Sequence, residues 1–459
     1  MLERLETANA ALKLVGALAE CVDRTERAVG TGHLAQPLNR LFAQVREPAE
    51  QVPSACGGHL STILDPVNRR DFLAASAAAA LSTHPLARHA LELQTALPKP
   101  AKSGLDHVVV VMMENRSFDH LLGWLPGADG KQEGLTYLDK NGVAHSTFPL
   151  APDFQGCSYT DPDHSYDGSR IEWNNGACDG FLRASDLWSI GYYQRPDLAF
   201  LGKAAPAFTA CDRFFASFMG PTFPNRFYSV SGVTDRLSNV ESPVALPTIF
   251  DRFAAKKIPA AYYYGNFPFI VLYQRYKNIS FKYATFFKQC RTGQLPAFSY
   301  IDPNFTFDDH GPASGNTGND DHPHADIRAG EYFMSTIYNA VTRSRAWPRT
   351  LLIFTFDEWG GFFDHVPPPA GPDVKPEYQQ RGFRIPALLV SPFARRGHVD
   401  HGVYDHTSIL RLLEWRWGLE PLSVRDAHAN NLAKALDFSH RNLHAPKIAA
   451  PKLFVGASC

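Results

Sequence analysis

Two apolar runs of the chain, residues 107–113 and 351–356, each end abruptly in a pair of side chains that carry oxygen atoms. A continuous apolar run is typical of a strand buried on both faces of a parallel sheet, and ligands bind just outside the carboxyl ends of such strands. The alternative is that each acid caps a following helix, but two adjacent polar pairs favour a common site. The pairs are Glu114 with Asn115, and Asp357 with Glu358.

The apolar pattern elsewhere predicts an α/β fold. Apolar residues recur at helical spacing from His324 to Trp347, so that a helix leads into the second run. Residues 385–391 are typical of a further strand, and residues 407–417 of a helix that Gly418 ends. These elements predict a mostly parallel central sheet flanked by helices.

Two long segments, residues 121–212 and 235–320, show no comparable periodicity and are rich in loop-forming residues. Binding pockets are often built from loops that a rigid scaffold holds in place. We expect both segments to be long insertions that form the rim of a pocket.

A helix start is predicted between the two apolar runs. In Gly220-Pro-Thr-Phe-Pro-Asn-Arg226, Pro224 suits the first turn of a helix and places Thr222 just ahead of it. Free backbone N–H groups and the positive end of the helix dipole make this a natural place for phosphate. Taken alone, Thr222 would be interpreted as a helix cap, but in company with the acids it is a candidate nucleophile.

Six short motifs occur along the chain in the order seen in one family. They are Glu114-Asn-Arg-Ser-Phe-Asp-His120, Asp161-Pro-Asp-His164, Gly220-Pro-Thr-Phe-Pro-Asn-Arg226, Asp320-Asp-His-Pro323, Thr355-Phe-Asp-Glu-Trp-Gly-Gly-Phe-Phe-Asp-His-Val366 and Tyr404-Asp-His-Thr-Ser-Ile-Leu-Arg411. With them the chain resembles the bacterial phospholipase C and acid phosphatase family of phosphoesterases, whose fold is similar to that of alkaline phosphatase. Each motif is weak alone, whereas six in sequence are specific.

The resemblance implies a role for each matched position. The hydroxyl at the Thr222 position is both a metal ligand and the nucleophile in family members, and the positions of His164 and His322 contact the phosphoryl group. A divalent cation is held at the positions that match Glu114, Asn115, Thr222, Asp357 and Glu358.

The chain departs from the family pattern at two aromatic positions. Trp359 stands where many relatives carry a histidine, and Phe223 where asparagine or aspartate is frequent. Together with Phe362 and Phe363, these side chains predict an apolar pocket wall, which favours a lipid substrate. Core packing is the alternative interpretation, and it is the commoner fate of a phenylalanine at such a place.

Physical chemistry leads to the same mechanism. A phosphodiester repels nucleophiles, so a cation that neutralises its oxygens and lowers the pKa of a hydroxyl removes two obstacles. Thr222 would attack phosphorus to give a phosphothreonine intermediate, while a histidine protonates the leaving alcohol. His164 and His322 are the candidates, and the sequence leaves open which of them acts. His365 and His406 are weaker candidates, because one suits a brace for the loop and the other a helix start.

The predicted ligands indicate a hard cation. Carboxylate, amide and hydroxyl oxygens suit magnesium, calcium or manganese, with zinc as an alternative that more often takes His or Cys. The seven cysteines show no CxxC spacing and indicate no metal cluster.

Composition agrees with a large globular enzyme. The chain has 459 residues, of which 44% are hydrophobic, and its net charge of -1 argues against an electrostatic grip on nucleic acid. No run reaches the roughly twenty apolar residues that span a bilayer. Nothing in the sequence indicates an oligomeric state.

The amino-terminal region contains a candidate export signal. Residues 68–82 begin Asn-Arg-Arg-Asp-Phe-Leu, continue in an alanine-rich stretch, and resemble a twin-arginine signal. An alanine-rich helix with two exposed arginines, Arg69 and Arg70, is the alternative. Because a signal belongs at the start of a chain, we interpret Val67 as a GTG start codon. The competing hypothesis is a genuine leader, since residues 2–18 are faintly amphipathic.

The expected organisation has four parts. They are a leader of doubtful status at 1–66, the signal and a linker at 67–100, the catalytic domain at 101–445 and a tail at 446–459. A protein exported by the twin-arginine route would be periplasmic, bound to the cell envelope or secreted.

These observations predict a metal-dependent phosphoesterase. The favoured function is that of a phospholipase C, which converts phosphatidylcholine-type phospholipids to diacylglycerol and a phosphorylated headgroup. Such an enzyme would make transient contact with a membrane surface. An acid phosphatase acting on phosphomonoesters is the first alternative. A phosphate- or headgroup-binding protein without turnover is the second, but the presence of Thr222 with all four other ligands argues against it.

Overall fold

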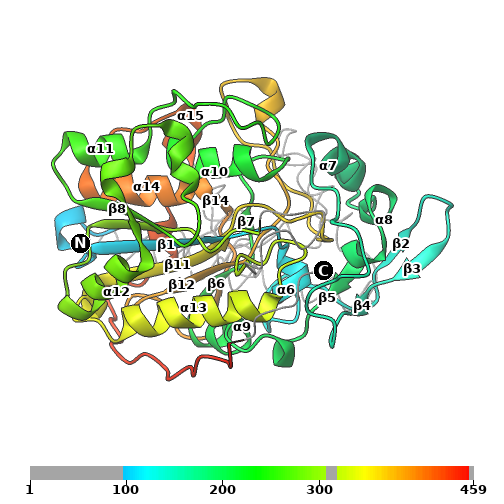
Figure 1. Ribbon diagram of the computed structural model, residues 1–459, viewed down its shortest axis with the longest axis horizontal. Coiled ribbons are helices and arrows are strands. Elements are labelled where there is room, and N and C mark those ends of the chain that lie inside the picture. Colours follow the sequence, from blue (N-terminus) through cyan, green and yellow to red (C-terminus); the bar gives the residue numbers. More distant parts are fainter. Residues whose placement is uncertain (1–96, 307–317, 454–459) are drawn as a thin grey trace, which may run out of the picture. The chain divides into compact units, whose positions relative to one another are not determined.

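An eight-stranded sheet runs through the part of the chain that the computed structural model describes, residues 97–306 and 318–453 (Figure 1). Neighbouring strands are parallel at every pairing except the two that β12 makes, with β11 and with β6. The expected mostly parallel sheet is thereby confirmed. In spatial order the strands are β13 (His398–Asp400), β6 (Thr209–Cys211), β12 (Ala387–Val390), β11 (Thr350–Phe356), β1 (His107–Met113), β10 (Phe298–Ile301), β8 (Ala260–Tyr264) and β9 (Ser280–Lys282).

Helices cover both faces of this sheet. In Figure 1, α10, α11, α14 and α15 lie on one face, and α9, α12 and α13 lie on the other. The helices are α6 (Phe118–Leu122), α7 (Tyr166–Trp173), α8 (Phe181–Ala184), α9 (Leu201–Ala204), α10 (Thr222–Ser231), α11 (Ile249–Ala255), α12 (Tyr283–Thr292), α13 (Ile327–Thr342), α14 (His406–Trp417) and α15 (Val424–His428).

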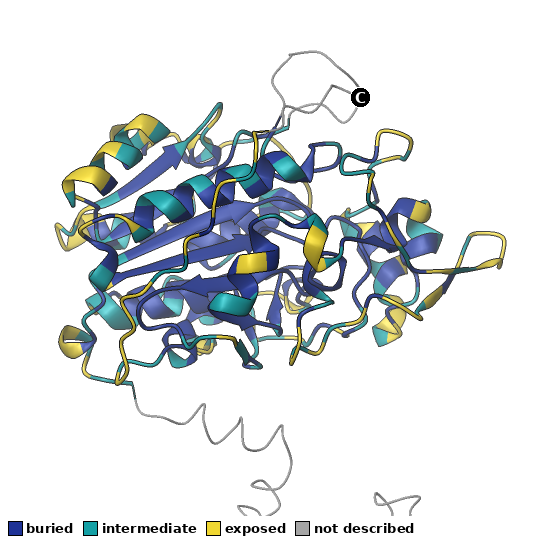
Figure 2. Ribbon diagram, turned by 90° about the horizontal axis from the view of Figure 1, so that it is seen from below, coloured by how far each residue is buried: buried dark blue, intermediate teal, exposed yellow. Residues whose placement is uncertain are grey.

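The two central strands are buried as their sequences predict. Every residue of β11 is buried, and in β1 only His107 is partly exposed. Figure 2 shows the strands as a buried layer, with exposed residues on the outer sides of the helices and in the loops. A strand covered on both faces has no polar face, which is why both runs are apolar throughout.

The predicted helices are present with adjusted ends. α13 begins at Ile327, three residues later than His324, because the side chain of Asp326 caps it by accepting from the N–H of Arg328 at 2.9 Å. α14 ends before Gly418, which has a φ of 62° and can adopt the left-handed conformation that ends a helix. Both helices lie on a face of the central sheet, as expected for an α/β fold.

The expectation that residues 235–320 form a loop-rich insertion was wrong. The described residues of this segment contribute α11, β8, β9, α12 and β10 to the sheet and its cover. Strands as short as Ser280–Lys282 and Phe298–Ile301 do not show a clear period in the sequence. Only their aromatic content, as in Ala260–Tyr264, indicates a strand.

Residues 121–212 keep more of the predicted loop character. They contain the hairpin of β2 (Thr136–Leu138) and β3 (Ala144–Ser146), which projects from the body in Figure 1, and the short helices α7 and α8. Two further short pairs complete the topology: β4 (Phe148–Pro149) with β5 (Gly191–Tyr192), and β7 (Phe214–Phe215) with β14 (Tyr404–Asp405).

The leader at 1–66 and the export signal with Arg69 and Arg70 lie outside the described residues. Within the described ranges, the structure contains no helix that is long and apolar enough to cross a bilayer.

Glu331 on α13 is a buried carboxylate with a pH-dependent role in the fold. Its Oε2 accepts hydrogen bonds from the backbone N–H groups of Phe200 and Leu201, the latter at 3.1 Å. Burial raises the pKa of Glu331 to about 7, although these hydrogen bonds oppose the rise. The folded protein therefore holds the proton of Glu331 more tightly than the unfolded chain does.

The substitution Glu331→Gln should make the free energy of unfolding less dependent on pH. Because the folded pKa lies above the ordinary value of 4.5, the stabilisation is complete below that pH and is lost as the pH rises through about 7, by about 3 kcal/mol in all. Urea unfolding of both proteins between about pH 5 and about pH 8 measures the difference. A wild type that gained stability relative to the variant over this range would contradict the prediction.

Candidate active site

The carboxyl ends of β1 and β11 lie side by side and bring the two polar pairs together. The strands pair in parallel with Met113 opposite Phe356, and the N–H of Asp357 donates to the carbonyl of Met113 at 3.0 Å. The N–H of Asn115 donates to Oδ1 of Asp357 at 3.1 Å. The gathering of both pairs at one place, expected from the two apolar runs, is therefore present in the structure.

Residues with positive φ shape the turns that follow the two strands. Asn115 has a φ of 57°, Gly360 of 65° and Gly361 of 70°. A Cβ atom at Gly360 would lie 2.2 Å from the carbonyl oxygen of Asn115, and one at Gly361 would lie 2.7 Å from Cβ of Pro162. The two glycines thus let the loop after β11 approach both the loop after β1 and the loop that carries His164.

Arg226 on α10 is the positive charge within this cluster. Its buried guanidinium lies 2.8 Å from a carboxylate oxygen of Glu114, 2.9 Å from one of Asp302 and 3.0 Å from one of Asp357. Thr222 lies four residues earlier in the same helix, so its side chain is on the same helix face. Thr222 therefore lies on the face of α10 that carries Arg226.

Thr222 itself is placed slightly differently from the expectation. It is the first residue of α10 rather than the residue ahead of it, because Pro221 occupies the cap position. Pro224 still lies in the first turn, where a missing N–H costs nothing. The Thr222 hydroxyl is not used as the helix cap, and this favours a chemical role over the capping interpretation.

The carboxyl groups of Glu114 and Glu358 are difficult to ionise without more positive charge. Glu114 is 5% exposed, and Asp357 and Glu358 are fully buried. Burial and then the charge of Asp357 raise the pKa of Glu114 well above its ordinary range, and burial raises the pKa of Glu358 to about 8. A cation among these side chains would stabilise their ionised forms.

Two oxygen atoms of the cluster fit such a cation. Oδ1 of Asn115 and Oε1 of Glu358 are buried and have no hydrogen-bond partner. An unpartnered buried oxygen is costly, and a divalent cation would satisfy both. The two groups of His, Cys, Asp and Glu that could hold an ion within the described residues are Asp161, His164, His322 and Asp119, Asp364, His365. Neither group includes Glu114, Asp357 or Glu358.

His164 and His322 lie together at the edge of the cluster, with their ring centroids 5.9 Å apart. Nδ1 of His164 lies 2.7 Å from the carbonyl of Pro162, and its Nε2 lies 3.2 Å from Nδ2 of Asn115 and 3.9 Å from Oε1 of Glu358. Burial lowers the pKa of His164, but neighbouring carboxylates, Glu358 first, outweigh it and raise the pKa to about 10. A bound cation would oppose that rise.

Asp161 and Arg226 are site residues that the sequence analysis missed. One ligand atom from each of Asp161, His164 and His322 lies within 4.8 Å of the others, and Oδ1 of Asp161, 3.9 Å from Nδ1 of His164, is buried and has no hydrogen-bond partner. The short spacing to His164 was the available signal for Asp161. For Arg226, the signal was its spacing of four residues from Thr222.

A second cluster of buried acids includes Asp364 on the loop after β11, and the side chain of Arg384 supplies its positive charge. Arg384 is fully buried, 3.0 Å from a carboxylate oxygen of Asp119 and 2.8 Å from one of Asp364. Nδ1 of His365 lies 2.5 Å from the other oxygen of Asp119. This ion-pair network braces the loop after β11, in agreement with the structural role expected for His365.

The predicted apolar pocket wall was wrong for three of its four members. Trp359, Phe362 and Phe363 are fully buried in the core. Trp359 donates from its indole N–H to Oε2 of Glu172 at 2.8 Å, which turns it away from the surface. Only Phe223 is partly exposed, so core packing, the commoner fate, applies to the other three.

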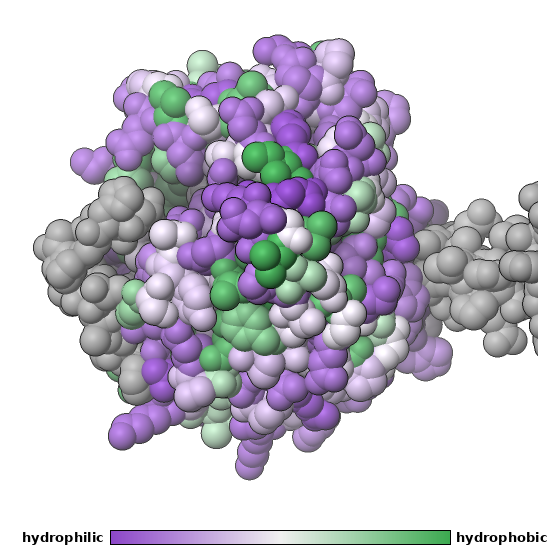
Figure 3. All heavy atoms as spheres, turned by 90° about the vertical axis from the view of Figure 1, so that its right-hand side faces the viewer, coloured by the Kyte–Doolittle hydropathy of each residue, from purple (hydrophilic) through white to green (hydrophobic). Residues whose placement is uncertain are grey.

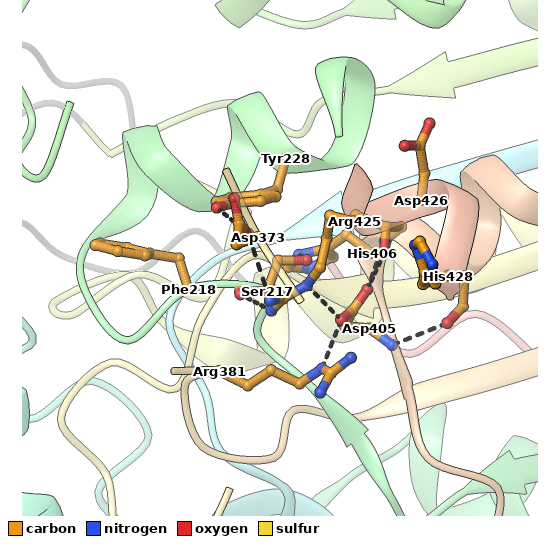
Figure 4. A network of polar contacts seen from close by, with 12 residues as sticks. Ser217, Phe218, Tyr228, Asp373, Arg381, Asp405, His406, Arg425, Asp426 and His428 are labelled. Atoms are coloured by element: carbon orange, nitrogen blue, oxygen red, sulfur yellow. Dashed lines mark hydrogen bonds and ion pairs between the residues drawn. The ribbon is translucent and has the colours of Figure 1, made fainter. Parts of the chain in front are cut away.

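Figure 4 shows a buried ion-pair network behind the site. Asp405, the residue before α14, accepts hydrogen bonds from Arg381 at 2.6 Å and Arg425 at 3.3 Å. Burial alone would raise the pKa of Asp405, but these two cations outweigh it and hold the pKa well below its usual range. Nε2 of His406 bonds to the carbonyl of Phe356 at 2.8 Å, so His406 fixes the end of β11 and is not free to transfer protons to a substrate.

The chain is similar to known phosphoesterases. Residues 105–420 match the Phosphoesterase family. Non-specific phospholipase C1 of Arabidopsis thaliana is 30% identical over 387 residues, which cover 73% of this chain and 72% of the relative. Non-hemolytic phospholipase C of Pseudomonas aeruginosa is 28% identical, with 82% of this chain and 64% of the relative covered. Phospholipase C B of Mycobacterium tuberculosis is 28% identical, with coverages of 85% and 91%.

Solved structures align with the chain at low similarity. One is a protein in the alkaline phosphatase superfamily from Vibrio parahaemolyticus, with 10% identity, coverages of 68% of this chain and 66% of that chain, and a TM-score of 0.33. Another is the lipoteichoic acid synthase LtaP from Listeria monocytogenes, with 8% identity, coverages of 75% and 81%, and a TM-score of 0.39. The family match, by contrast, spans more than half of the chain. The chain belongs to the Phosphoesterase family and is a hydrolase of phosphoric esters.

Proposed function

We propose that this phosphoesterase is a phospholipase C that hydrolyses phosphatidylcholine-type phospholipids to diacylglycerol and a phosphorylated headgroup. The observation that carries the proposal is the helix face that Thr222 shares with Arg226, whose guanidinium contacts Glu114 and Asp357. The substrate class is suggested by the relatives, which are named as phospholipases C.

Glu114, Asn115, Asp357 and Glu358, with the hydroxyl of Thr222, would hold one divalent cation. When bound, this cation supplies charge neutralisation of the phosphate and lowers the pKa of the Thr222 hydroxyl. The unpartnered oxygens of Asn115 and Glu358 support this ligand set. Magnesium, calcium and manganese are the cations we favour.

In the proposed reaction, the hydroxyl of Thr222 loses its proton to solvent, its oxygen attacks phosphorus, and the bond between phosphorus and the glycerol oxygen breaks. The glycerol oxygen takes a proton and leaves as diacylglycerol, while the headgroup phosphate remains esterified to Thr222. Water then hydrolyses this ester and restores the hydroxyl. His164 or His322 donates the proton and later activates the water, because both lie at the edge of the cluster.

An acid phosphatase that acts on phosphomonoesters is the alternative. The burial of Trp359, Phe362 and Phe363 favours it, since the apolar wall expected for a lipid substrate is not built from these residues. A phosphomonoesterase must bind a dianionic phosphate and needs no apolar wall. The two proposals therefore differ in the substrate that is turned over and share the nucleophile.

The substitution Thr222→Ala should lower turnover of phosphatidylcholine by about 10³-fold or more, because it removes the hydroxyl that we propose as the nucleophile. Diacylglycerol release and hydrolysis of a phosphomonoester are measured in parallel with added cation, using Thr222→Ser as the control that keeps a hydroxyl. Near-normal activity of Thr222→Ala would exclude the mechanism. Efficient cleavage of the monoester with no diacylglycerol would establish the acid phosphatase instead.

The substitution Arg226→Gln should destabilise the metal-free protein by about 3–5 kcal/mol, because it leaves buried carboxylates without their counter-charge. A divalent cation should recover part of this loss, so the rise in melting temperature on adding magnesium should be larger in the variant than in the wild type. Arg425→Gln is the matched control, since Arg425 is equally buried but pairs with Asp373 and Asp405. An equal cation-induced rise in both variants would contradict the assignment of the cation to this cluster.

We also propose that the protein is exported by the twin-arginine route, from the pattern around Arg69 and Arg70. Replacing both arginines with lysine should retain the enzyme in the cytoplasm with unchanged specific activity, and a chain that starts at Val67 should be exported as well as the long form. Fractionation of producing cells measures both. Exported protein that still carried residues from before Val67 would disprove the proposed start.

A further inference from the structure

We propose that an apolar rim beside the nucleophile, formed by Phe223, Val240, Phe267 and Val271, is the surface with which the enzyme docks on a zwitterionic phospholipid bilayer. The inference rests on the proposed function, because it names the surface through which a membrane-bound substrate reaches Thr222. It also replaces the buried aromatic residues as the source of lipid contact.

Two segments place this rim next to the active site. Phe223 follows Thr222, and its N–H donates to Oδ1 of Asn239 at 2.8 Å, which brings Val240 alongside. The ring of Phe223 lies 5.1 Å, between centroids, from that of Phe269, which stands between the other two rim residues in sequence. The first turn of α10 is therefore bordered by both segments.

The two segments also bind one another, so the rim is one continuous structure. The N–H of Val244 donates to the carbonyl of Leu272 at 2.9 Å. Arg236 donates to the carbonyl of Ser242 at 3.1 Å and lies over the ring of Phe227, 4.9 Å from its centroid. These contacts fix the 238–244 segment on α10 and leave the rim side chains at the surface.

The rim is apolar and exposed. Val240 is 52% exposed, Phe267 is 38% exposed and Val271 is 45% exposed. Exposed hydrophobic groups also lie among hydrophilic ones on the face that carries the β2–β3 hairpin, which Figure 3 shows. Exposed apolar groups that gather beside a catalytic residue mark a contact surface rather than ordinary surface composition.

A lipid bilayer is the occupant that the chemistry selects. The phosphate that Thr222 would attack lies at the boundary between water and hydrocarbon, so side chains beside the nucleophile enter the acyl region when the phosphate is reached. The charges near the rim are paired, Arg236 with Asp235 at 2.6 Å and Arg275 with Asp251 at 3.0 Å. Glu241, next to Val240, is exposed. This balance suits a zwitterionic surface better than an anionic one.

The test separates binding from turnover. Two full-length proteins are co-sedimented with phosphatidylcholine vesicles. One carries Thr222→Ala alone and cannot consume the lipid, and the other carries Val240→Asp and Val271→Asp in addition. We expect the two rim substitutions to weaken vesicle binding by about tenfold or more, because each places a charge in the acyl region. Leu443→Asp is the matched control. Leu443 is 49% exposed, and its carbonyl accepts from the indole N–H of Trp347, near the amino end of β11 and far from the site.

A second measurement uses the proteins with Thr222 intact. The rim variant should lose turnover on vesicles while its kcat/KM on a water-soluble phosphocholine ester stays within about twofold of the wild type. Unchanged vesicle binding, equal losses on both substrates, or binding that requires anionic lipid would each overturn the rim assignment. If the wild type released no diacylglycerol while rim-dependent vesicle binding persisted, the proposed function would fail and the docking surface would stand.

Discussion

Mutual repulsion between buried carboxylates is the constraint on which the active site depends. Glu114, Asp302 and Asp357 converge on the single guanidinium of Arg226, and Glu358 adds a further acid that this arginine does not contact. Arg226 and His164, whose pKa the carboxylates raise to about 10, supply two positive charges for four acids, which leaves room for a cation. The same guanidinium fixes the orientation of α10 and with it the position of Thr222. In the proposed mechanism, the charges of the protein and the bound cation therefore act as one electrostatic unit.

The contrast with the cluster around Arg384 supports this view. Asp119 and Asp364 are also buried, yet Arg384 contacts both and His365 supplies a further donor. There the protein provides its own counter-charge, and the result is a brace for the loop. At the active site the protein supplies fewer positive charges than there are acids. This imbalance is expected of a site that binds a cation, and it would be costly in a cluster with a purely structural role.

The fold was predictable where a single physical rule decided the local structure. Residues 107–113 form a strand over the full predicted length, because burial on both faces requires an unbroken apolar run. The cap of α14 at Asp405 was predictable from its side chain. The strands of residues 235–320 were not, because elements of three to five residues show no clear period. Their identity depends on pairing with β1 and one another, which a linear pattern does not contain.

The candidate site could be predicted in its strand ends but not in its cross-chain contacts. Glu114 and Asp357 were predictable because parallel strands share one carboxyl edge. The pairing of Arg226 with Asp302 was not, since 76 residues separate them. The fates of Trp359 and Phe362 also depended on tertiary packing, because an aromatic residue after a strand can face either the core or the surface.

The close contact at Gly360 divides the site into a fixed half and an adjustable half. Any side chain at that position would meet the carbonyl oxygen of Asn115 at 2.2 Å, so the loop after β11 has no room for variation that would reshape the pocket. The segments around Val240 and Val271 are held from outside and carry exposed side chains. New substrate preferences can thus be engineered in those segments while the cation-binding half remains unchanged, and this makes the 238–244 and 267–273 segments the places to diversify in a library.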